Sequence, residues 1–241
     1  MSNVWVGIVV GVLSSGSGVA EKINIVALCV SLPLAGVLLY LGGNFLNDWM
    51  DRNWDEKHRP ERALPRGLFR PGLYATLALF MGITGVSLAA HTSRESGMVA
   101  AGIVFWIVVY TLFHKRTSWA VIPMGLCRAF LPVMGCVAIF PYLDHIWPAA
   151  CALCCYIAGL SLSARYESMA APPKRIAVMA RGLLLATAVL VAWGNRGLFI
   201  DRTSNVIGVL PYLAWTSICL RYWKNPMPRL VSRLLAGIPL V

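Results

Sequence analysis

Apolar stretches alternate with short polar ones along the whole chain, and many of the apolar stretches are long enough to cross a membrane. A bilayer-spanning helix takes about 20 residues. Nine apolar segments lie near residues 3 to 13, 25 to 47, 72 to 90, 98 to 113, 119 to 140, 146 to 163, 176 to 193, 206 to 220 and 230 to 241. This pattern predicts an all-α fold, a polytopic membrane helix bundle that forms a single domain over residues 1–241.

Composition agrees with this pattern and excludes an ordinary soluble domain. Of the 241 residues, 58% are hydrophobic and only 13% are charged, and the mean hydropathy is +0.69. The first and last segments are shorter than a full span. Either both ends of the chain are truncated, or these segments are incomplete spans that rest against the others. The end at Leu240 and Val241, inside an apolar run, favours truncation.

Basic residues are distributed unevenly between the loops, which predicts how the protein is oriented. Positive loops remain on the cytoplasmic side of a membrane. The loops after the second, fourth, sixth and eighth segments hold Arg52, Lys57, Arg59, Arg62, Arg66, Arg70, Lys115, Arg116, Arg165, Lys174, Arg175, Arg221, Lys224, Arg229 and Arg233. The opposite loops hold only Lys22, Arg94, Arg196 and Arg202. We therefore expect an integral protein of the bacterial inner membrane. The net charge of +11 reflects topology rather than nucleic-acid binding.

Acidic and amide side chains gather at the end of the second segment. If its helix continues, Asn44, Asp48, Asp51 and Asp55 recur at steps of four and three, and Asn47 lies beside them. Carboxylates on one stripe repel each other unless a cation lies among them, and hard oxygen ligands suit Mg²⁺. These five residues, hereafter the acidic stripe, are candidate metal ligands. The simpler alternative is a solvated helix end.

The loop that follows supplies several guanidinium groups. Pro60 and Pro65 interrupt the helix, and Arg59, Arg62 and Arg66 lie around them. Arginine suits phosphate because its planar fork donates paired hydrogen bonds. A metal patch beside an arginine cluster is typical of a diphosphate site, although a basic loop that only sets topology would have the same composition.

The acidic stripe and the basic loop together resemble the first signature of the UbiA-type intramembrane prenyltransferases. The matching residues are Asn47-Asp48-x-x-Asp51-x-x-x-Asp55, then Arg59-Pro60-x-Arg62-x-Leu64-x-x-Gly67. Tyr110-x-x-x-x-Lys115-Arg116-Thr117 is similar to the Tyr-rich, Lys-Arg-Thr loop of that family, and Gly125-Leu126-Cys127-Arg128-Ala129 resembles its fifth helix. The resemblance covers most of the chain. It implies nine transmembrane helices around a central cavity, with the active-site loops on the cytoplasmic side.

This resemblance implies transfer of an isoprenoid chain from a prenyl diphosphate to an aromatic, quinone-precursor or other lipophilic acceptor. Mg²⁺ on the acidic stripe would assist departure of the diphosphate. The implied catalytic residues include Asp51 and Asp55. Candidate diphosphate contacts are Arg59, Arg62, Arg66, Lys115, Arg116 and Arg128.

The chain departs from the family at the second aspartate-rich motif, which belongs after the sixth helix. Leu162-Ser163-Ala164-Arg165-Tyr166-Glu167-Ser168 stands there instead. We expect Arg165 to contact the diphosphate in place of a second metal, with Glu167 either ligating metal or orienting that arginine. This departure indicates a divergent branch, for which the UbiA-like proteins of ebo-type gene clusters are the candidate.

The remaining polar residues within apolar surroundings allow more than one interpretation. Arg128 is costly inside a bilayer, so it either faces the cavity or reaches the membrane surface. The seven cysteines fall in apolar segments, where a thiol behaves as a small hydrophobe. The four histidines lie in or beside loops, where we expect surface positions.

Two other functions fit the same pattern. The protein could transfer a phosphoribosyl-type group to a polyprenyl phosphate, for which the altered second motif leaves room. It could instead be a transporter or scaffold without catalysis. Transporters place ionisable groups near the middle of the bilayer, whereas the acidic residues here gather at one edge of the predicted helices.

Overall fold

A computed structural model describes residues 2–15, 25–140, 142, 144–165, 173–194 and 210–218, and the described part is helical without strands. The helices are α1 (Ser2–Ser15), α3 (Ile25–His58), α4 (Pro71–Thr92), α5 (Arg94–Phe113), α6 (Val121–Val137), α7 (Trp147–Arg165) and α8 (Lys174–Gly194). A short 3₁₀ turn, η1 (Ser118–Ala120), precedes α6, and residues 210–218 are also helical. Each of the first eight predicted segments overlaps one of these helical stretches, which confirms the all-α membrane fold. The ninth, residues 230 to 241, lies outside the described residues.

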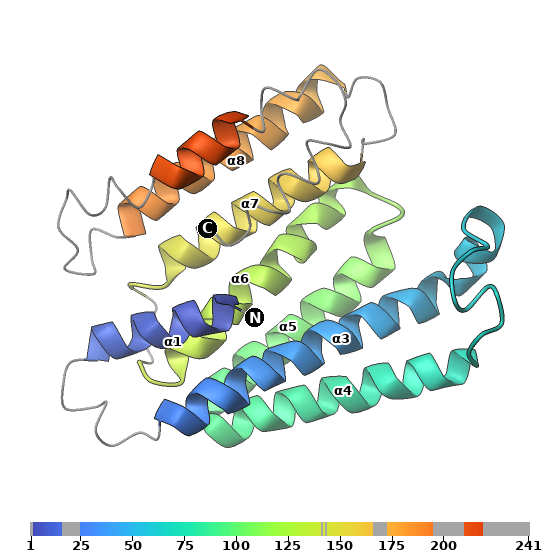
Figure 1. Cartoon of the computed structure of the whole chain (residues 1–241), viewed down its shortest axis with the longest axis horizontal. Coiled ribbons are helices and arrows are strands. Elements are labelled where there is room, and N and C mark those ends of the chain that lie inside the picture. Colours follow the sequence, from blue (N-terminus) through green and yellow to red (C-terminus); the bar gives the residue numbers. More distant parts are fainter. Residues whose placement is uncertain are drawn as a thin grey trace.

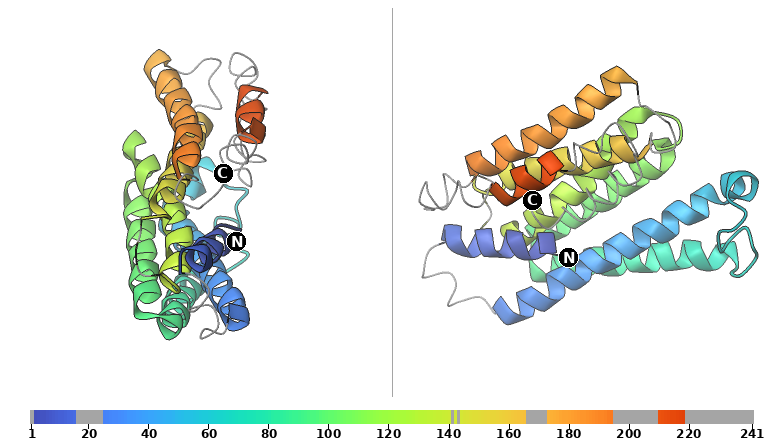
Figure 2. Two further views of the ribbon diagram at one scale, coloured as in Figure 1. Left: turned by 90° about the vertical axis from the view of Figure 1, so that its left-hand side faces the viewer. Right: turned by 45° about the horizontal axis from the view of Figure 1, so that its top comes forward.

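Helices that follow one another in sequence lie side by side. From α3 to α8, each helix packs against the next, and α1 packs mainly on α6 (Figure 1). Two views from other directions show the same long, roughly aligned helices, with α1 and residues 210–218 on one side of the others (Figure 2). One core cluster joins α1, α3, α4, α5 and α6, and a second joins α6, α7 and α8. Helix α6 therefore belongs to both halves of the core.

Glycine allows α1 to approach α6 closely. A Cβ atom added at Gly135 of α6 would overlap the backbone carbonyl of Val4 in α1, and one added at Gly7 would overlap the carbonyl of Pro132. Small residues at helix contacts are typical of membrane proteins, because helices associate there through close packing.

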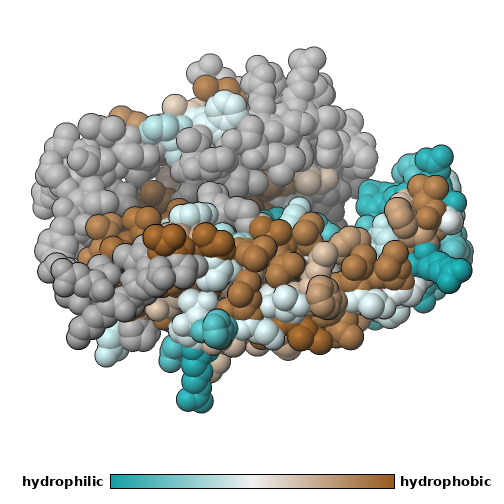
Figure 3. Space-filling model, turned by 60° about the horizontal axis from the view of Figure 1, so that its bottom comes forward, coloured by the Kyte–Doolittle hydropathy of each residue, from teal (hydrophilic) through white to brown (hydrophobic). Residues whose placement is uncertain are grey.

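The surface of the described helices suits a hydrocarbon environment. Six of these helices are long and apolar enough to cross a membrane. Large apolar side chains such as Leu79, Phe80 and Phe105 are more than half exposed on α4 and α5. Apolar residues cover much of the described surface drawn in Figure 3; the largest hydrophilic group lies at the end that carries the loop after α3, and a smaller one projects at the lower left. The loop after α3 is therefore the most polar part of the described face in this view.

The loop between α3 and α4 begins and ends at prolines. Helix α3 ends at His58, before Pro60, and α4 begins at Pro71, whose ring fixes a helical φ at the first position. Within the loop, Gly67 has a φ of +69°. Leu68 N–H donates to Ala63 O across this turn at 3.1 Å, so the loop folds back on itself beside the end of α3.

Candidate active site at the C-terminal end of α3

The acidic stripe lies on a regular helix, because α3 continues to His58, well past the predicted end at residue 47. Asp51 and Asp55 are buried, at 7% and 2% exposure, although both carry carboxylates. Asn47 and Asp48 are half-buried, and Asn44 is exposed. A buried carboxylate needs partners that replace water, and the structure provides them from two loops.

The turn after α5 provides the partners of Asp51. Lys115 Nζ lies 2.8 Å from Asp51 Oδ1, and His114 Nε2 lies 3.1 Å from Asp51 Oδ2. His114 Nδ1 is 3.1 Å from the carbonyl oxygen of Thr111, which fixes the orientation of the imidazole ring. The amide of Asn47, one turn earlier on α3, donates to Asp51 Oδ2 at 3.4 Å.

Aromatic packing holds Lys115 in place. Its Nζ lies 4.0 Å from the centre of the Trp54 ring, on the face of the indole. Trp54 in turn stacks on His58, with ring centres 4.1 Å apart. A cation over an indole face is attracted by the electron density of the ring. Lys115 is therefore fixed between Asp51 and Trp54.

The loop after α3 provides the partner of the other two carboxylates. Arg62 Nη1 donates to Asp55 Oδ2 at 2.9 Å and to Asp48 Oδ1 at 3.2 Å. These three residues line a cavity of about 300 Å³ together with Pro65 and Tyr74. The acidic stripe is thus divided between two groups of contacts: Asp51 with Lys115 and His114, and Asp48 and Asp55 with Arg62.

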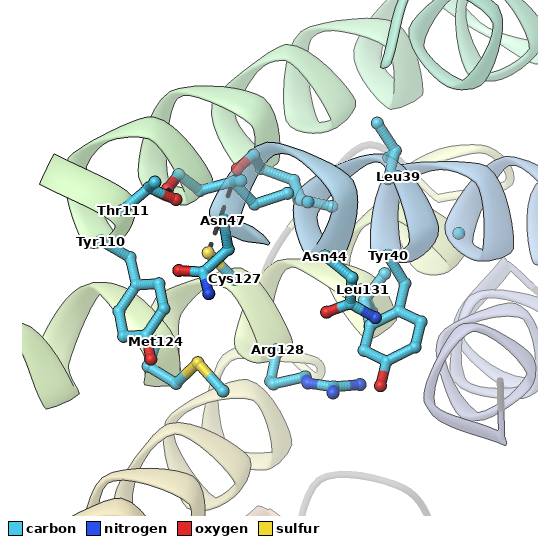
Figure 4. A pocket seen from close by; sticks show the side chains of 14 residues that line it. Leu39, Tyr40, Asn44, Asn47, Tyr110, Thr111, Met124, Cys127, Arg128 and Leu131 are labelled. Carbon is cyan, nitrogen blue, oxygen red and sulfur yellow. Dashed lines mark hydrogen bonds between the residues drawn. The ribbon is translucent and has the colours of Figure 1, made fainter. Parts of the chain in front are cut away.

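A second cavity, of about 170 Å³, lies on the α5 and α6 side of the stripe (Figure 4). Most of its wall is apolar, and polar groups enter it at Asn44, Asn47, Tyr110 and Arg128. The Arg128 guanidinium lies 4.8 Å from the centre of the Tyr40 ring. In Figure 4, Arg128 points toward Tyr40 and Asn44, away from Tyr110. We call this space the inner cavity.

The donor set at this end of α3 fits Mg²⁺. Asn47 Oδ1 is buried and has no hydrogen-bond partner in the described part of the chain, so it is free to coordinate a cation. Among the described residues, no group of three His, Cys, Asp or Glu side chains is gathered around one point. Mg²⁺ typically uses one or two carboxylates and completes its shell with substrate phosphates and water. A site built from Asn47 and Asp51 or Asp55 meets that requirement.

The structure brings some of the predicted site residues together and leaves others apart. Lys115 and Arg62 contact the stripe as described above. Arg59, Arg66 and Arg116 are exposed, and within the described residues none of them forms an ion pair with it. Arg128 lies in the inner cavity. The side chain of Arg165, at the end of α7, and all of Glu167 lie outside what the structure describes.

The prediction that all four histidines are surface residues is wrong for His114. Its side chain is only 16% exposed and contacts Asp51. Its position at the helix end, directly before Lys115, was the available signal. Sequence reasoning also missed Tyr40, Trp54 and Tyr74. An aromatic residue in an apolar segment has no pattern that distinguishes a site from a core position.

Three curated proteins with similar sequences carry the same name, protoheme IX farnesyltransferase. The protein is 28% identical over 229 residues to the protoheme IX farnesyltransferase of Synechococcus elongatus, a match that covers 84% of this chain and 71% of the relative. It is 38% identical over 100 residues to the enzyme of that name from Ruegeria pomeroyi, covering 39% of this chain and 31% of the relative. The match to the Aeromonas salmonicida enzyme is 31% over 147 residues, covering 57% and 50%. In these last two matches, the chain spans a third to a half of the relative.

Solved structures share the fold. A UbiA homologue from Aeropyrum pernix K1 has a TM-score of 0.76 at 14% identity, over 99% of this chain and 96% of that chain. A structure from work on digeranylgeranylglyceryl phosphate synthase in membranes has a TM-score of 0.74 at 16% identity, over 100% and 90%. At these identities the likeness concerns the fold alone. A sequence model of the UbiA prenyltransferase family matches residues 4–236, nearly the whole chain, and the protein therefore belongs to that family.

Proposed function

We propose that this protein is an integral-membrane prenyltransferase that moves an isoprenoid chain from a prenyl diphosphate to a lipophilic acceptor. The observation that carries the proposal is the pairing of buried carboxylates on α3 with Lys115 and Arg62, beside an apolar cavity. Family membership supports the same reaction class.

The donor diphosphate is assigned to the end of α3. Lys115 and Arg62 contact the stripe at present. The Arg62 side chain is partly exposed, so it can also reach an arriving anion, whereas the Lys115 ammonium is buried between Asp51 and Trp54 and has to turn away from them to do so. Charge-assisted hydrogen bonds from such cations to phosphate oxygens are stronger than hydrogen bonds between neutral groups. The three carboxylates of the stripe carry one more negative charge than Lys115 and Arg62 together neutralise, so the site can accept a further positive charge.

Mg²⁺ is the proposed source of that charge. Asp51, with Asn47 or Asp55, would hold it, with Asp48 in support, and the bound ion would neutralise charge on the departing diphosphate. Asn44 lies eleven residues before Asp55 on α3, about 16 Å along the helix axis, which is too far for both to contact one ion. Lys115 and Arg62 already contact carboxylate oxygens of the acidic stripe, so they compete with the metal ion for those oxygens.

The reaction breaks the bond between the allylic carbon and the diphosphate oxygen, and the electron pair leaves with diphosphate. A nucleophilic carbon of the acceptor forms the new bond. An aromatic acceptor then loses the proton of that carbon, whereas a vinyl acceptor is left with a cation on the neighbouring carbon, which is quenched by loss of a proton or by addition of water. The apolar wall of the inner cavity excludes water, which would otherwise capture the allylic cation.

The acceptor class is proposed from the relatives. Three of them are called protoheme IX farnesyltransferase, so protoheme IX with farnesyl diphosphate is the first pair to assay. Aromatic and quinone-precursor acceptors form the second group. We propose further that the loop after α3 faces the cytoplasm of a bacterial inner membrane, as its basic residues predict.

The test is release of inorganic diphosphate by purified protein in nanodiscs, supplied with prenyl diphosphates of several lengths, with and without Mg²⁺ and each acceptor. We expect release that requires Mg²⁺ and is lost in Asp51→Asn. Lys57→Met is the matched control, because Lys57 is exposed on the last turn of α3 and has no ion pair within the described residues. Binding and release of a phosphoribosyl diphosphate in place of every prenyl donor would overturn the proposal.

A further inference from the structure

Arg128 is the charged residue among those that line the inner cavity. It lies on α6, a helix that belongs to both halves of the core and spans the apolar part of the molecule. Its guanidinium rests on the ring of Tyr40 from α3, and Asn44 lines the same part of the wall (Figure 4). The fold therefore points a permanent positive charge into an apolar space.

This charge lacks a counter-ion in the part of the chain that the structure describes. No carboxylate there lies within ion-pair distance of Arg128, and its one described contact is the ring of Tyr40. Lys115 and Arg62, by contrast, each have a carboxylate partner. An arginine held at membrane depth is costly and marks a functional site when it faces a cavity. A bound anion would complete the arrangement.

The anion cannot be the diphosphate held at the end of α3. Tyr40 and Asp51 are eleven residues apart on one helix, which corresponds to about 16 Å along its axis. The side chains of both residues lean toward the N-terminus of the helix, so this tilt does not close the separation. A single diphosphate group is much shorter than this separation. Arg128 and Lys115 therefore serve different groups.

We propose that Arg128, with Asn44 and Tyr40, binds a carboxylate carried by the acceptor, at the end opposite its reacting carbon. This inference rests on the proposed prenyl transfer. The guanidinium offers a planar pair of donors that matches a carboxylate, the Asn44 amide supplies a further N–H, and the Tyr40 face sets the plane of the guanidinium.

Charge and size both favour one carboxylate over a phosphate group. One arginine balances a monoanion, whereas the diphosphate end of the site collects Lys115, Arg62 and a proposed metal. The cavity of about 170 Å³ is smaller than the roughly 300 to 1,000 Å³ that encloses a drug-sized ligand. It accepts one end of an acceptor, whose reacting carbon then extends toward Asp51. The site selects elongated acceptors with an acid group far from the prenylated carbon.

The test compares acids with their methyl esters, which remove the charge and little else. Protoheme IX is paired with its dimethyl ester in equilibrium binding to protein in nanodiscs. We expect the acid to bind about tenfold or more tightly than its ester. Arg128→Gln should abolish this preference, and Arg128→Lys, which keeps the charge but loses the fork, should retain part of it.

Arg181→Gln is the matched control, since Arg181 is an arginine near the start of α8 that does not line the cavity. It should leave the acid preference unchanged. Farnesyl diphosphate affinity should also be unchanged in Arg128→Gln. Equal binding of the acid and its ester would overturn the proposal, as would a loss of donor affinity in Arg128→Gln with the acid preference intact. Because binding needs no turnover, acid preference without diphosphate release would count against the proposed reaction and not against this site.

Discussion

Asp51 is the residue on which most contacts of the candidate site converge. Its two carboxylate oxygens meet Lys115 at 2.8 Å and His114 at 3.1 Å, and its side chain is almost fully buried. Removing one partner of such a pair leaves a charge poorly solvated. The position therefore contributes to stability as well as to the proposed chemistry, and the two contributions have to be separated by experiment.

A double-mutant cycle separates them. Asp51→Asn and Lys115→Met should each lower the free energy of unfolding, and the double variant should lose less than the sum, with a coupling of about 1 to 3 kcal/mol. The measurement is denaturant unfolding in mixed micelles. Lys57→Met, at an exposed lysine on the same helix, should be neutral. Additive losses would mean that the 2.8 Å contact contributes nothing to stability.

A substitution at Arg165 tests the role predicted for the segment that replaces the second aspartate-rich motif. If Arg165 contacts the diphosphate directly, Arg165→Asp should weaken prenyl diphosphate binding about tenfold or more, even at high Mg²⁺. The measurement is donor affinity across a Mg²⁺ titration, with Arg175→Asp, in the first turn of α8, as the control for loss of a nearby basic residue. Tighter donor binding in Arg165→Asp would show that the position favours a metal ligand.

The helices could be predicted wherever a long apolar run marks the whole helix. The apolar runs of α4 and α5 coincide with their helices to within a few residues. Helix α3 extends eleven residues beyond its apolar run, because helix geometry continues through the acidic stripe until the proline at position 60. The sequence does not predict that Asp51 contacts the turn after α5 while Asp48 and Asp55 contact the loop after α3. These contacts depend on the side from which each segment approaches the helix.

The loop after α3 depends on one backbone position. Gly67 has a φ of +69°, and a Cβ added there would meet nothing within 4 Å. Gly67→Ala therefore introduces backbone strain without steric overlap and should destabilise the loop by about 1 to 2 kcal/mol. We expect weaker donor binding through displacement of Arg62, measured as an increased dissociation constant for farnesyl diphosphate.

Gly72→Ala is the control, because Gly72 lies in the first turn of α4, also has open space around it and has no positive φ. It should leave donor affinity unchanged. Equal donor affinity in wild type and Gly67→Ala would show that the conformation of this turn does not position Arg62.

For the molecule as a whole, the sequence established the class of fold, and family membership and the structure agree with it. The inner cavity could not be foreseen. Its wall combines Tyr40 and Asn44 from α3 with Arg128 from α6, and no periodicity indicates that these residues meet. Long-range packing decides which residues in apolar segments line a space and which fill the core.

The distribution of basic residues predicts how the whole protein is oriented in the membrane. Glu61→Cys, in the loop after α3, should react with an impermeant thiol reagent only from the cytoplasmic side, and Arg94→Cys, at the start of α5, only from the opposite side. Labelling of intact cells and of inverted vesicles distinguishes the two, with wild type showing the background of the native cysteines. The reverse pattern would place the candidate site outside the cytoplasm.

The central claim is that this protein joins an isoprenoid chain to an acceptor with the help of Asp51. The most direct test is mass spectrometry of the products formed from isotopically labelled farnesyl diphosphate and an acceptor mixture that contains protoheme IX. The account predicts a labelled product heavier than one acceptor by one isoprenoid group, with or without one added water, formed only with Mg²⁺ and absent with Asp51→Asn. Equal product formation by wild type and Asp51→Asn, in protein of matched stability, would contradict it.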